Sequence, residues 1–395
     1  MDNKDILISG AGIAGVTLAY WLKKFGFNPT IVERAPKLRE GGYAIDFWGA
    51  GYDVAERMDI LPDLNRADLQ IPEVTVVNEK GKRKCGINYP KLKKLMNGRA
   101  FTLLRSDLSK IIYQHLEKDV EVIFGDSITT IDQQPTHVKV TFRSGMIREF
   151  HLVIGADGLH SIVRELVFGH ESKFEKFFGY YTSSYTIADS MVDQNAFLMY
   201  NTPRKQAAIY STDESKTTTT FFIFSSPQKM NYSHHDVEAQ KQILRNEFES
   251  AGWICPELLA KLETTPDFYF DVVSQVQMSR WSKERVTLVG DACDCPSLLS
   301  GQGSTLAMTG AYVLAGELKE ANGDYKTAFE RYETKFKPFI EDKQKTAQRF
   351  SKSFVPKSKL GIWIRDLGIK MMSFEFVSKM FVKPFMDDEL KLKLY

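Results

Sequence analysis

Three glycines near the N-terminus have the spacing of a loop that binds a dinucleotide. The segment Gly10-Ala11-Gly12-Ile13-Ala14-Gly15 fits the pattern G-x-G-x-x-G. In this pattern the first glycine permits a tight turn, the second lets a pyrophosphate approach the backbone, and the third lets a helix pack on the preceding strand. The phosphates would lie at the N-terminus of that helix, where free N–H groups point at them. Glu33, at the end of the next predicted strand, is placed to accept hydrogen bonds from an adenosine ribose.

A second turn of this kind lies in the middle of the chain. The apolar run Leu152-Val153-Ile154 leads into Gly155-Ala156-Asp157-Gly158, and Ser161 and Arg164 follow on the next predicted helix. Many proteins contain such a strand, Asp-Gly turn and capped helix. Alone, this motif therefore has low specificity.

A third motif separates the possible cofactors. The strand Val286–Val289 leads into Gly290 and Asp291, and a turn Gly301-Gln302-Gly303 then precedes a helix. Asp291 would present a carboxylate to a ribityl chain. The turn would bring a helix N-terminus against negative charge, which a reduced flavin carries around its N1/O2 edge. The first loop is compatible with NAD or FAD, whereas this motif favours FAD.

The chemistry expected of the protein's own side chains is limited. No Ser, Cys and His constellation typical of nucleophilic catalysis is evident, so we expect no catalytic side chain. The cysteines contain no C-x-x-C pair, and no histidine cluster lies near Cys293 and Cys295, so we expect no metal site. Reduced structural thiols are the better interpretation.

The elements that would position these motifs begin with a βαβ unit. We expect a strand over 5–9, a helix over 13–25 closed by Gly26, and a strand over 30–33. The later predicted strands are 120–124, 137–142, 149–154, 197–200, 207–211, 217–224 and 285–290. The later predicted helices are 105–116, 304–318, 325–353 and 360–383, with a break at Pro356 between the last two.

Composition places the chain among ordinary folded proteins. Of 395 residues, 43% are hydrophobic and 26% are charged, and the length suits two interleaved domains with an appendage. The formal net charge is only +2, and basic residues are spread along the chain, so we expect no nucleic-acid partner. Without a signal-peptide pattern or a membrane span, we expect a cytoplasmic monomer or weak dimer.

Together the three motifs resemble those of the group A flavin-dependent aromatic monooxygenases, the para-hydroxybenzoate hydroxylase-like class. That class carries a GxGxxG, a DG and a GD motif in this order. Within it, the chain is most similar to the tetracycline destructases, which inactivate tetracyclines. The similarity rests on three segments: Arg39-Glu40-Gly41-Gly42-Tyr43-Ala44-Ile45-Asp46, Arg105-Ser106-Asp107-Leu108 and Gly301-Gln302-Gly303.

The resemblance implies roles for individual residues. These are Glu33 and Arg34 at the adenosine, Arg105 at the FAD ribose or pyrophosphate, Asp46 near the flavin ring, Asp157 in the DG motif, Asp291 at the ribityl chain or pyrophosphate, Gly10, Gly12, Ala14, Gly15, Gly301, Gln302 and Gly303 along the cofactor, and Arg39 in reduction by nicotinamide. Arg105 has the alternative of a surface helix partner, and Asp46 that of a turn cap. Where the class usually has His and Asn, this chain has Asp294 or Cys295 and Ser304 or Thr305, so backbone contacts are expected there.

The fold implied is α/β: a Rossmann-like FAD-binding domain interleaved with a β-sheet substrate domain, plus C-terminal helices. We expect residues 1–70, 102–172 and 278–320 in the FAD-binding domain and 71–101 and 173–277 in the substrate domain. Residues 321–395 would form the C-terminal helices, a possible lid.

The activity implied is hydroxylation of an electron-rich polycyclic phenol or enol, such as a tetracycline, by resident FAD with transiently bound NAD(P)H and O2. One dinucleotide loop suits one resident cofactor. A hydroxylase of a simpler phenol, an NAD-dependent dehydrogenase and a non-catalytic flavin-binding protein are the alternatives.

Candidate substrate contacts are weaker. Phe222 and Phe224 share a strand face and are candidate pocket residues, although such a pair is more typical of a core. Arg204 loosely matches a substrate-contacting arginine of the tetracycline enzymes, or is a solvated turn residue. In the amphipathic segment from Leu360, the residues expected to face the pocket if it forms a lid are Met371, Met372 and Phe374. A membrane-surface helix is less favoured there because its charges are mixed.

Overall fold

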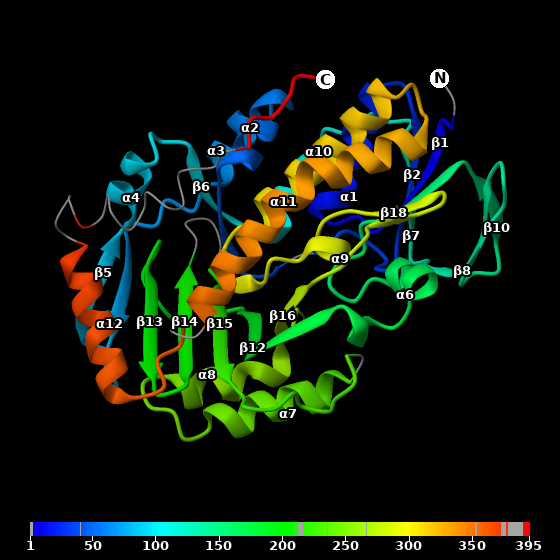
Figure 1. The fold of residues 1–395 in the computed structure, drawn as a ribbon. Helices are drawn as coiled ribbons and strands as arrows, with labels where there is room; N and C mark the ends of the chain where they lie inside the picture. Colours follow the sequence, from blue (N-terminus) through cyan, green and yellow to red (C-terminus); the bar gives the residue numbers. More distant parts are fainter. Residues whose placement is uncertain are drawn as a thin grey trace.

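The computed structural model describes residues 3–39, 41–211, 216–234, 236–265, 267–351, 354–372, 377 and 390–395. Its fold is α/β, as predicted, with a parallel sheet and a larger antiparallel-rich sheet side by side (Figure 1). A long helix crosses between them, and the two described chain ends lie at the same end of the molecule (Figure 1).

The parallel sheet is built from the apolar strands predicted to carry the motifs. Its order is β17-β18-β11-β1-β2-β7, and all neighbouring pairs except β17–β18 are parallel. Ile6, Leu7 and Ile8 are fully buried, as expected when helices cover both faces of a parallel sheet. The strands are β1 (Asp5–Ser9), β2 (Asn28–Glu33), β7 (Glu121–Phe124), β11 (Leu152–Gly155), β17 (Ser282–Lys283) and β18 (Val286–Leu288).

Helices from distant parts of the chain surround this sheet. They are α1 (Ile13–Lys24), α2 (Ala50–Arg57), α3 (Leu61–Ala67), α5 (Arg105–Gln114), α6 (Ile162–Phe168), α9 (Asp291–Asp294) and α10 (Gly303–Glu320). Helix α10 packs along α1, and both are almost wholly buried. Short 3-10 turns lie at Glu171–Lys173, Leu262–Thr264 and Leu298–Ser300.

Two smaller sheets accompany the parallel one. The strands β8 (Ile128–Gln133), β9 (Val138–Phe142) and β10 (Ile147–Phe150) form an antiparallel sheet, and β3 (Ala44–Trp48) pairs with β6 (Ala100–Leu104). The single strand expected over 149–154 is wrong. The chain breaks at His151, whose backbone N donates to Asp5, so that β10 and β11 belong to different sheets.

The second large sheet has the order β16-β12-β15-β14-β13-β4-β5. Helices α7 (Val237–Phe248) and α8 (Cys255–Lys261) cover one of its faces, and aromatic side chains fill the space between (Figure 1). Its strands are β4 (Glu73–Val77), β5 (Arg83–Asn88), β12 (Glu175–Ile187), β13 (Phe197–Thr202), β14 (Lys205–Ser211), β15 (Thr218–Ser225) and β16 (Tyr269–Val276). Helix α4 (Tyr89–Leu95) follows β5.

The last part of the chain touches both large sheets. Helix α11 (Tyr325–Ser351) packs on α10, where a Cβ at Gly310 would lie 2.8 Å from the Phe336 ring. Helix α12 (Lys359–Met371) packs on β5 and β13, and the tail 390–395 returns to α10 (Figure 1). A deletion from Leu360 onward would therefore remove the tail as well as α12. Among the described residues, no helix is sufficiently long and apolar to cross a bilayer.

Candidate functional site

The three glycine motifs meet at one edge of the parallel sheet. Strands β1, β11 and β18 end in register there, since Ser9 pairs with Gly155 and Gly155 pairs with Leu288. A Cβ at Gly10 would lie 2.6 Å from the Ala156 oxygen, and a Cβ at Gly290 would lie 3.0 Å from the Ala14 Cβ. The motifs are thus in van der Waals contact, at the carboxyl ends of the strands where ligands bind in open α/β sheets.

The first loop fits a bound pyrophosphate. A Cβ at Gly15 would lie 1.9 Å from the Gly10 oxygen, so only glycine lets α1 approach the loop, whereas a Cβ at Gly12 would meet no atom within 4 Å. No side chain caps α1, and its first turn holds no acid. The N–H groups of that turn have no intrahelical acceptor and face this open space, as anion binding requires.

A second uncapped helix start lies close by. Gln302 makes no capping hydrogen bond to α10, the first turn of α10 contains no acid, and a Cβ at Gly303 would lie 4.0 Å from Asp291 Oδ1. The Thr305 hydroxyl donates to the Trp48 oxygen (2.8 Å), which ties β3 to this helix. In the described part of the chain, the buried indole N–H of Trp48 has no acceptor. These groups suit the polar edge of a flavin.

The acidic end of β2 is fixed against the first loop. Glu33 accepts from the backbone N–H of Ala11 (2.9 Å) and of Ala35 (2.8 Å). Arg34 and Arg39 follow it and are exposed. The carboxylate therefore lies beside the nucleotide loop, and the adenosine and nicotinamide roles of these three residues remain predictions.

Charged and phenolic side chains lie close together between the third motif and the larger sheet. Arg105 begins α5, and its guanidinium keeps access to solvent although protein surrounds it. Burial raises the pKa of Asp291, and the charge of Arg105 opposes this rise. Burial also raises the pKa of Tyr43 to about 12 and that of Tyr269 well above its usual range. Arg105 thus supplies a fixed cation near Asp291, and both phenols stay neutral at ordinary pH.

Asp46 is held inside the β3–β6 pair. Its carboxylate accepts from Tyr89 Oη (2.8 Å) and Thr102 Oγ1 (2.9 Å), and burial raises its pKa against these hydrogen bonds. The turn-cap alternative is wrong, because Asp46 lies within β3. It shares a strand face with Trp48, which contacts the 301 turn, so its predicted place near the flavin ring stays open to test.

Asp157 holds the second turn in place through three hydrogen bonds. It accepts from Ser161 Oγ, from the Val163 backbone N–H (3.1 Å) and from Ser9 Oγ (3.3 Å), which joins α6 to the end of β1. Its carboxylate therefore fixes the shape of the second turn, and direct contact with a cofactor remains a prediction.

Arg164 connects the second and third motifs, a role that motif matching missed. It is only 1% exposed and donates to the backbone oxygens of Ala292 (2.9 Å) and Leu159 (2.6 Å). The available signal was a cation in the first turn of a helix, where the helix dipole disfavours positive charge.

We expect Arg164→Met to destabilise the fold and to lower FAD occupancy. The change removes a donor from the buried carbonyl of Ala292 and from the half-buried carbonyl of Leu159, which costs about 2–4 kcal/mol. Thermal unfolding of the apoprotein and the FAD content of the purified protein measure the effect. Arg148→Met is the control, since Arg148 pairs with Glu121 at the surface and such pairs contribute less than about 1 kcal/mol. Equal losses in the two variants would contradict the linking role.

The positions at which the chain departs from the resembled class face inward. Asp294 is 1% exposed, and burial raises its pKa well above the usual range. Thr305 is also buried, with its hydroxyl on Trp48. Side chains of these two residues are therefore used in packing, which leaves cofactor contacts there to the backbone.

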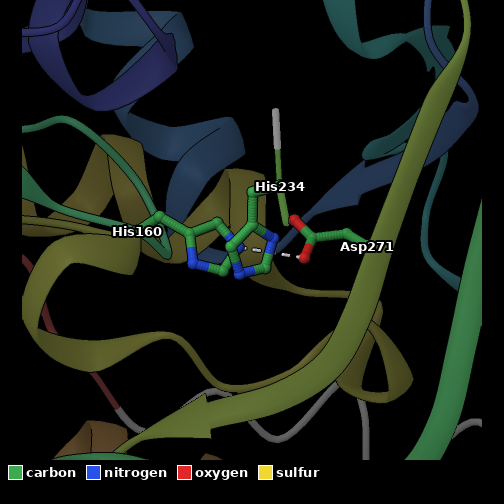
Figure 2. Close-up of side chains that lie close together, drawn as sticks. All are labelled: His160, His234 and Asp271. Carbon is green, nitrogen blue, oxygen red and sulfur yellow. Dashed lines mark hydrogen bonds and ion pairs between the residues drawn. The ribbon is translucent and has the colours of Figure 1, made fainter. Parts of the chain in front are cut away.

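Two histidines and an acid, His160, His234 and Asp271, lie close together, and Asp271 joins them to Tyr269 (Figure 2). His160 bonds through Nδ1 to Glu171 (2.8 Å) and through Nε2 to Asp271 (3.1 Å), and the His234 ring lies 3.8 Å away. Tyr269 Oη donates to the other oxygen of Asp271 (3.3 Å). Ligand atoms of His160, His234 and Asp271 lie within 4.8 Å of one another, a grouping that the sequence did not reveal. Because carboxylates occupy both nitrogens of His160, this group is described best as an ion-pair network.

This network predicts a pH dependence of stability. Burial lowers the pKa of His160, but hydrogen bonds to Asp271 and Glu171 raise it to about 9, from 6.5 when unfolded. A raised pKa stabilises fully below pH 6.5, and the contribution disappears as the pH rises through 9. We expect His160→Gln to cost about 1–2 kcal/mol at pH 6 and little at pH 10. Denaturant titrations of both proteins at the two pH values measure this, and an equal cost at both would contradict it.

The predicted substrate residues are dispersed. Phe222 and Phe224 are 0% exposed and pack on Phe248 of α7, which corrects the expectation that they line the pocket. Phe221 lies on the opposite face of β15, and its ring is 5.7 Å from the Tyr43 ring. Because side chains alternate between the two faces of a strand, Phe221 faces the site while Phe222 faces the core.

Arg204 lies in the β13–β14 turn. It is exposed, has a positive φ of 69° and donates its backbone N–H to Pro356, which is the solvated turn residue of the alternative interpretation. Met371 is exposed at the end of α12 with Met372 after it, and Phe374 lies outside the described residues.

Comparison with known proteins gives a consistent result. The FAD binding domain model matches residues 3–346. An uncharacterized protein of Mycobacterium tuberculosis is 39% identical over 86% of this chain and 92% of its own length. A flavin-dependent monooxygenase of Legionella longbeachae is 36% identical over 91% of each chain. The crystal structure of tetracycline destructase Tet(51) matches with a TM-score of 0.87 and 34% identity over 100% of both chains.

Proposed function

This chain belongs to the FAD binding domain family and is an FAD-dependent monooxygenase, and we propose that it hydroxylates an electron-rich polycyclic phenol or enol of the tetracycline type. The observation that carries this substrate class is the likeness to tetracycline destructase Tet(51), which extends over the whole of both chains. That coverage includes the larger sheet and the C-terminal helices, from which a substrate pocket would be built.

The chain's own residues would hold FAD, orient the substrate and shield both from water. The first turn of α1 and the space above Gly12 would bind the pyrophosphate, and the start of α10 with Asp291 would bind the ribityl and flavin portion. When bound and reduced, FAD supplies the oxygen-transfer chemistry that no side chain provides. Tyr43, Phe221 and Tyr269 would form an aromatic wall that positions a polycyclic ring and excludes water.

Arg105 would stabilise negative charge at the site. It would stabilise the negative charge of the cofactor and of an enolate substrate beside it, while Asp291 stays close enough for Arg105 to oppose the rise in its pKa. Neutral Tyr43 would donate a hydrogen bond to a substrate oxygen, whereas the Tyr269 hydroxyl already donates to Asp271.

We also propose transient NAD(P)H and O2 as co-substrates. Arg39 is exposed on the segment that leads from β2 to Gly41, whose Cβ would lie 2.2 Å from Asp267, a residue of the loop before β16. A nicotinamide dinucleotide would approach along this connection, where Arg39 offers a cation for its phosphates.

The proposed domain division keeps the predicted boundaries, with α11, α12 and the tail as the third part. Met371 is 46% exposed on the outer face of α12, which corrects the expectation that it faces the pocket, and Met372 follows the helix. Gly26 and Pro356 mark element ends that agree with the described helices.

Substrate-stimulated NADPH oxidation tests the proposal. Purified FAD-loaded protein is assayed with a panel of tetracyclines and simple phenols, and the products are analysed for a mass gain of one oxygen atom. We expect tetracyclines to stimulate NADPH and O2 consumption and to gain that oxygen. A response to simple phenols alone would reject the tetracycline class. A colourless protein would support a dehydrogenase, and a yellow protein without turnover on any compound would support a binding protein.

A further inference from the structure

Beyond the proposed function, we propose that the outer face of α12 docks on the surface of an anionic phospholipid bilayer. The inner face of the helix is satisfied: Ile362, Asp366 and Ile369 are buried. Ile369 packs with Val76 and Cys85 of the larger sheet. The outer face is the unusual feature.

That outer face is a continuous apolar stripe. Its members recur at the spacing of one helix face and are all exposed, Trp363 by 61%: Leu360, Trp363, Ile364, Leu367 and Met371. Apolar residues at i, i+3, i+4, i+7 and i+11 normally face a core. Here that arrangement is turned outward, at the edge of the molecule away from α10 (Figure 1).

Between Pro356 and Met372 the exposed charged side chains are all basic. Between Pro356 and Met372 the only acid is Asp366, and it is 4% exposed and bonded to Lys84 and Arg365. Although burial raises the pKa of Asp366, its hydrogen bonds to Lys84 and Arg365 lower it overall, so the acid stays ionised and internally paired. Asp366, the described acid of this segment, is therefore turned inward, while Glu375, which also contributed to the mixed charge, lies outside the described residues.

Exposed Lys357, Lys359 and Lys370 form a basic rim around the stripe, and β5 and α4 carry further basic residues. Helix α12 packs on β5, the edge strand of the larger sheet, and α4 follows β5. From Glu79 to Arg99 the sequence contains one acid and eight basic residues: Lys80, Lys82, Arg83, Lys84, Lys91, Lys93, Lys94 and Arg99. Arg83, Lys84, Lys93 and Arg99 pair with carboxylates. Exposed lysines remain at Lys80, Lys82 and Lys94, and along α12 and just before it at Lys357, Lys359 and Lys370.

An apolar stripe with a lysine rim fits a bilayer better than other partners. Apolar side chains enter the acyl boundary while lysines reach the anionic headgroups. Two copies joined by this face would bring like-charged rims together, and a nucleic acid would leave the leucine and isoleucine side chains against phosphates. An anionic bilayer satisfies both parts of the surface.

The fluorescence of Trp363 reports whether the outer face of α12 enters a bilayer. Among the described tryptophans it is the exposed one, since Trp21 and Trp281 are buried and Trp48 and Trp253 are half-buried. FAD-loaded protein is mixed with vesicles of phosphatidylcholine alone or of equal parts phosphatidylcholine and phosphatidylglycerol, with co-sedimentation and tryptophan emission as readouts. We expect binding to the anionic vesicles, weakened by salt, with an emission shift to shorter wavelength that Trp363→Phe removes.

Two variants separate the parts of the surface. The triple variant Leu360→Gln, Trp363→Gln, Ile364→Gln should bind at least about tenfold more weakly with an unchanged unfolding temperature. The pair Lys357→Glu, Lys359→Glu should lose the preference for anionic lipid. Ile147→Gln is the matched control, because Ile147 is an equally exposed apolar residue on β10.

Other outcomes reject the proposal. These are no binding to either vesicle, full binding by the triple variant, or a wild-type dimer in solution that the triple variant no longer forms. A marked fall in the unfolding temperature of the triple variant would show that the chain itself covers the stripe. Binding of RNA without binding of vesicles would assign the rim to a polyanion.

Discussion

Gly12→Val is expected to abolish tight FAD binding while leaving the apoprotein folded. A Cβ at this position meets no protein atom within 4 Å, and the backbone of Gly12 is extended with φ −72°, which valine adopts readily. The added side chain would instead fill the space above the first turn of α1, where a pyrophosphate must approach. We expect FAD affinity to fall by about 100-fold or more, equivalent to about 3 kcal/mol, in fluorescence titrations of the apoprotein.

Two further glycine variants make this result specific. Gly368→Val adds the same side chain to α12, where a Cβ is also free of contacts, and should leave FAD affinity unchanged. Gly15→Val should instead disrupt folding, because its Cβ would lie 1.9 Å from the Gly10 oxygen. If Gly12→Val bound FAD as tightly as Gly368→Val, the pyrophosphate would not lie over this loop.

Arg105→Met is expected to weaken FAD binding by about tenfold to 100-fold, because hydrogen bonds and contacts to charged groups contribute about 1.5–3 kcal/mol. The variant also removes the positive charge that opposes the raised pKa of Asp291. We therefore expect FAD affinity, measured by titration as the pH is lowered from 9 to 6, to decline at a higher pH in Arg105→Met than in Arg105→Lys. The sign follows from the carboxyl, which without the cation binds its proton more readily.

Arg99→Met serves as the matched control for this second variant. Arg99 lies just before β6, whereas Arg105 lies just after it. Arg99 pairs with Asp53 and Glu56 at the surface. It should retain FAD affinity. An Arg105→Met protein that behaved like Arg99→Met would assign Arg105 to the surface helix pair of the alternative interpretation.

The parts of the fold that the sequence predicted are those with local causes. Glycine turns, an apolar run such as Ile6-Leu7-Ile8 and the acid at Glu33 each depend on neighbours within a few residues, and the βαβ unit was accurate to within two residues. The ends of parallel strands meet at one edge, so the convergence of three motifs followed from topology.

The residues that were missed depend on contacts between distant segments. Arg164 bonds to Ala292, and Asp271 bonds to His160, pairs that no local pattern joins. Phe222 was assigned to the pocket and Phe221 was not, because a strand pattern gives two faces without saying which one is covered by α7. The ion pair of Asp366 with Lys84 was missed for the same reason, since it joins α12 to β5.

A crystal structure of the protein with FAD tests the central claim most directly, namely that three separated turns hold one cofactor at the carboxyl edge of the parallel sheet. We predict the pyrophosphate within hydrogen-bonding distance of the backbone N–H groups at the start of α1, and the flavin ring against the Gly301–Gly303 turn. A flavin bound away from that turn, or phosphates that do not contact the α1 start, would contradict the account.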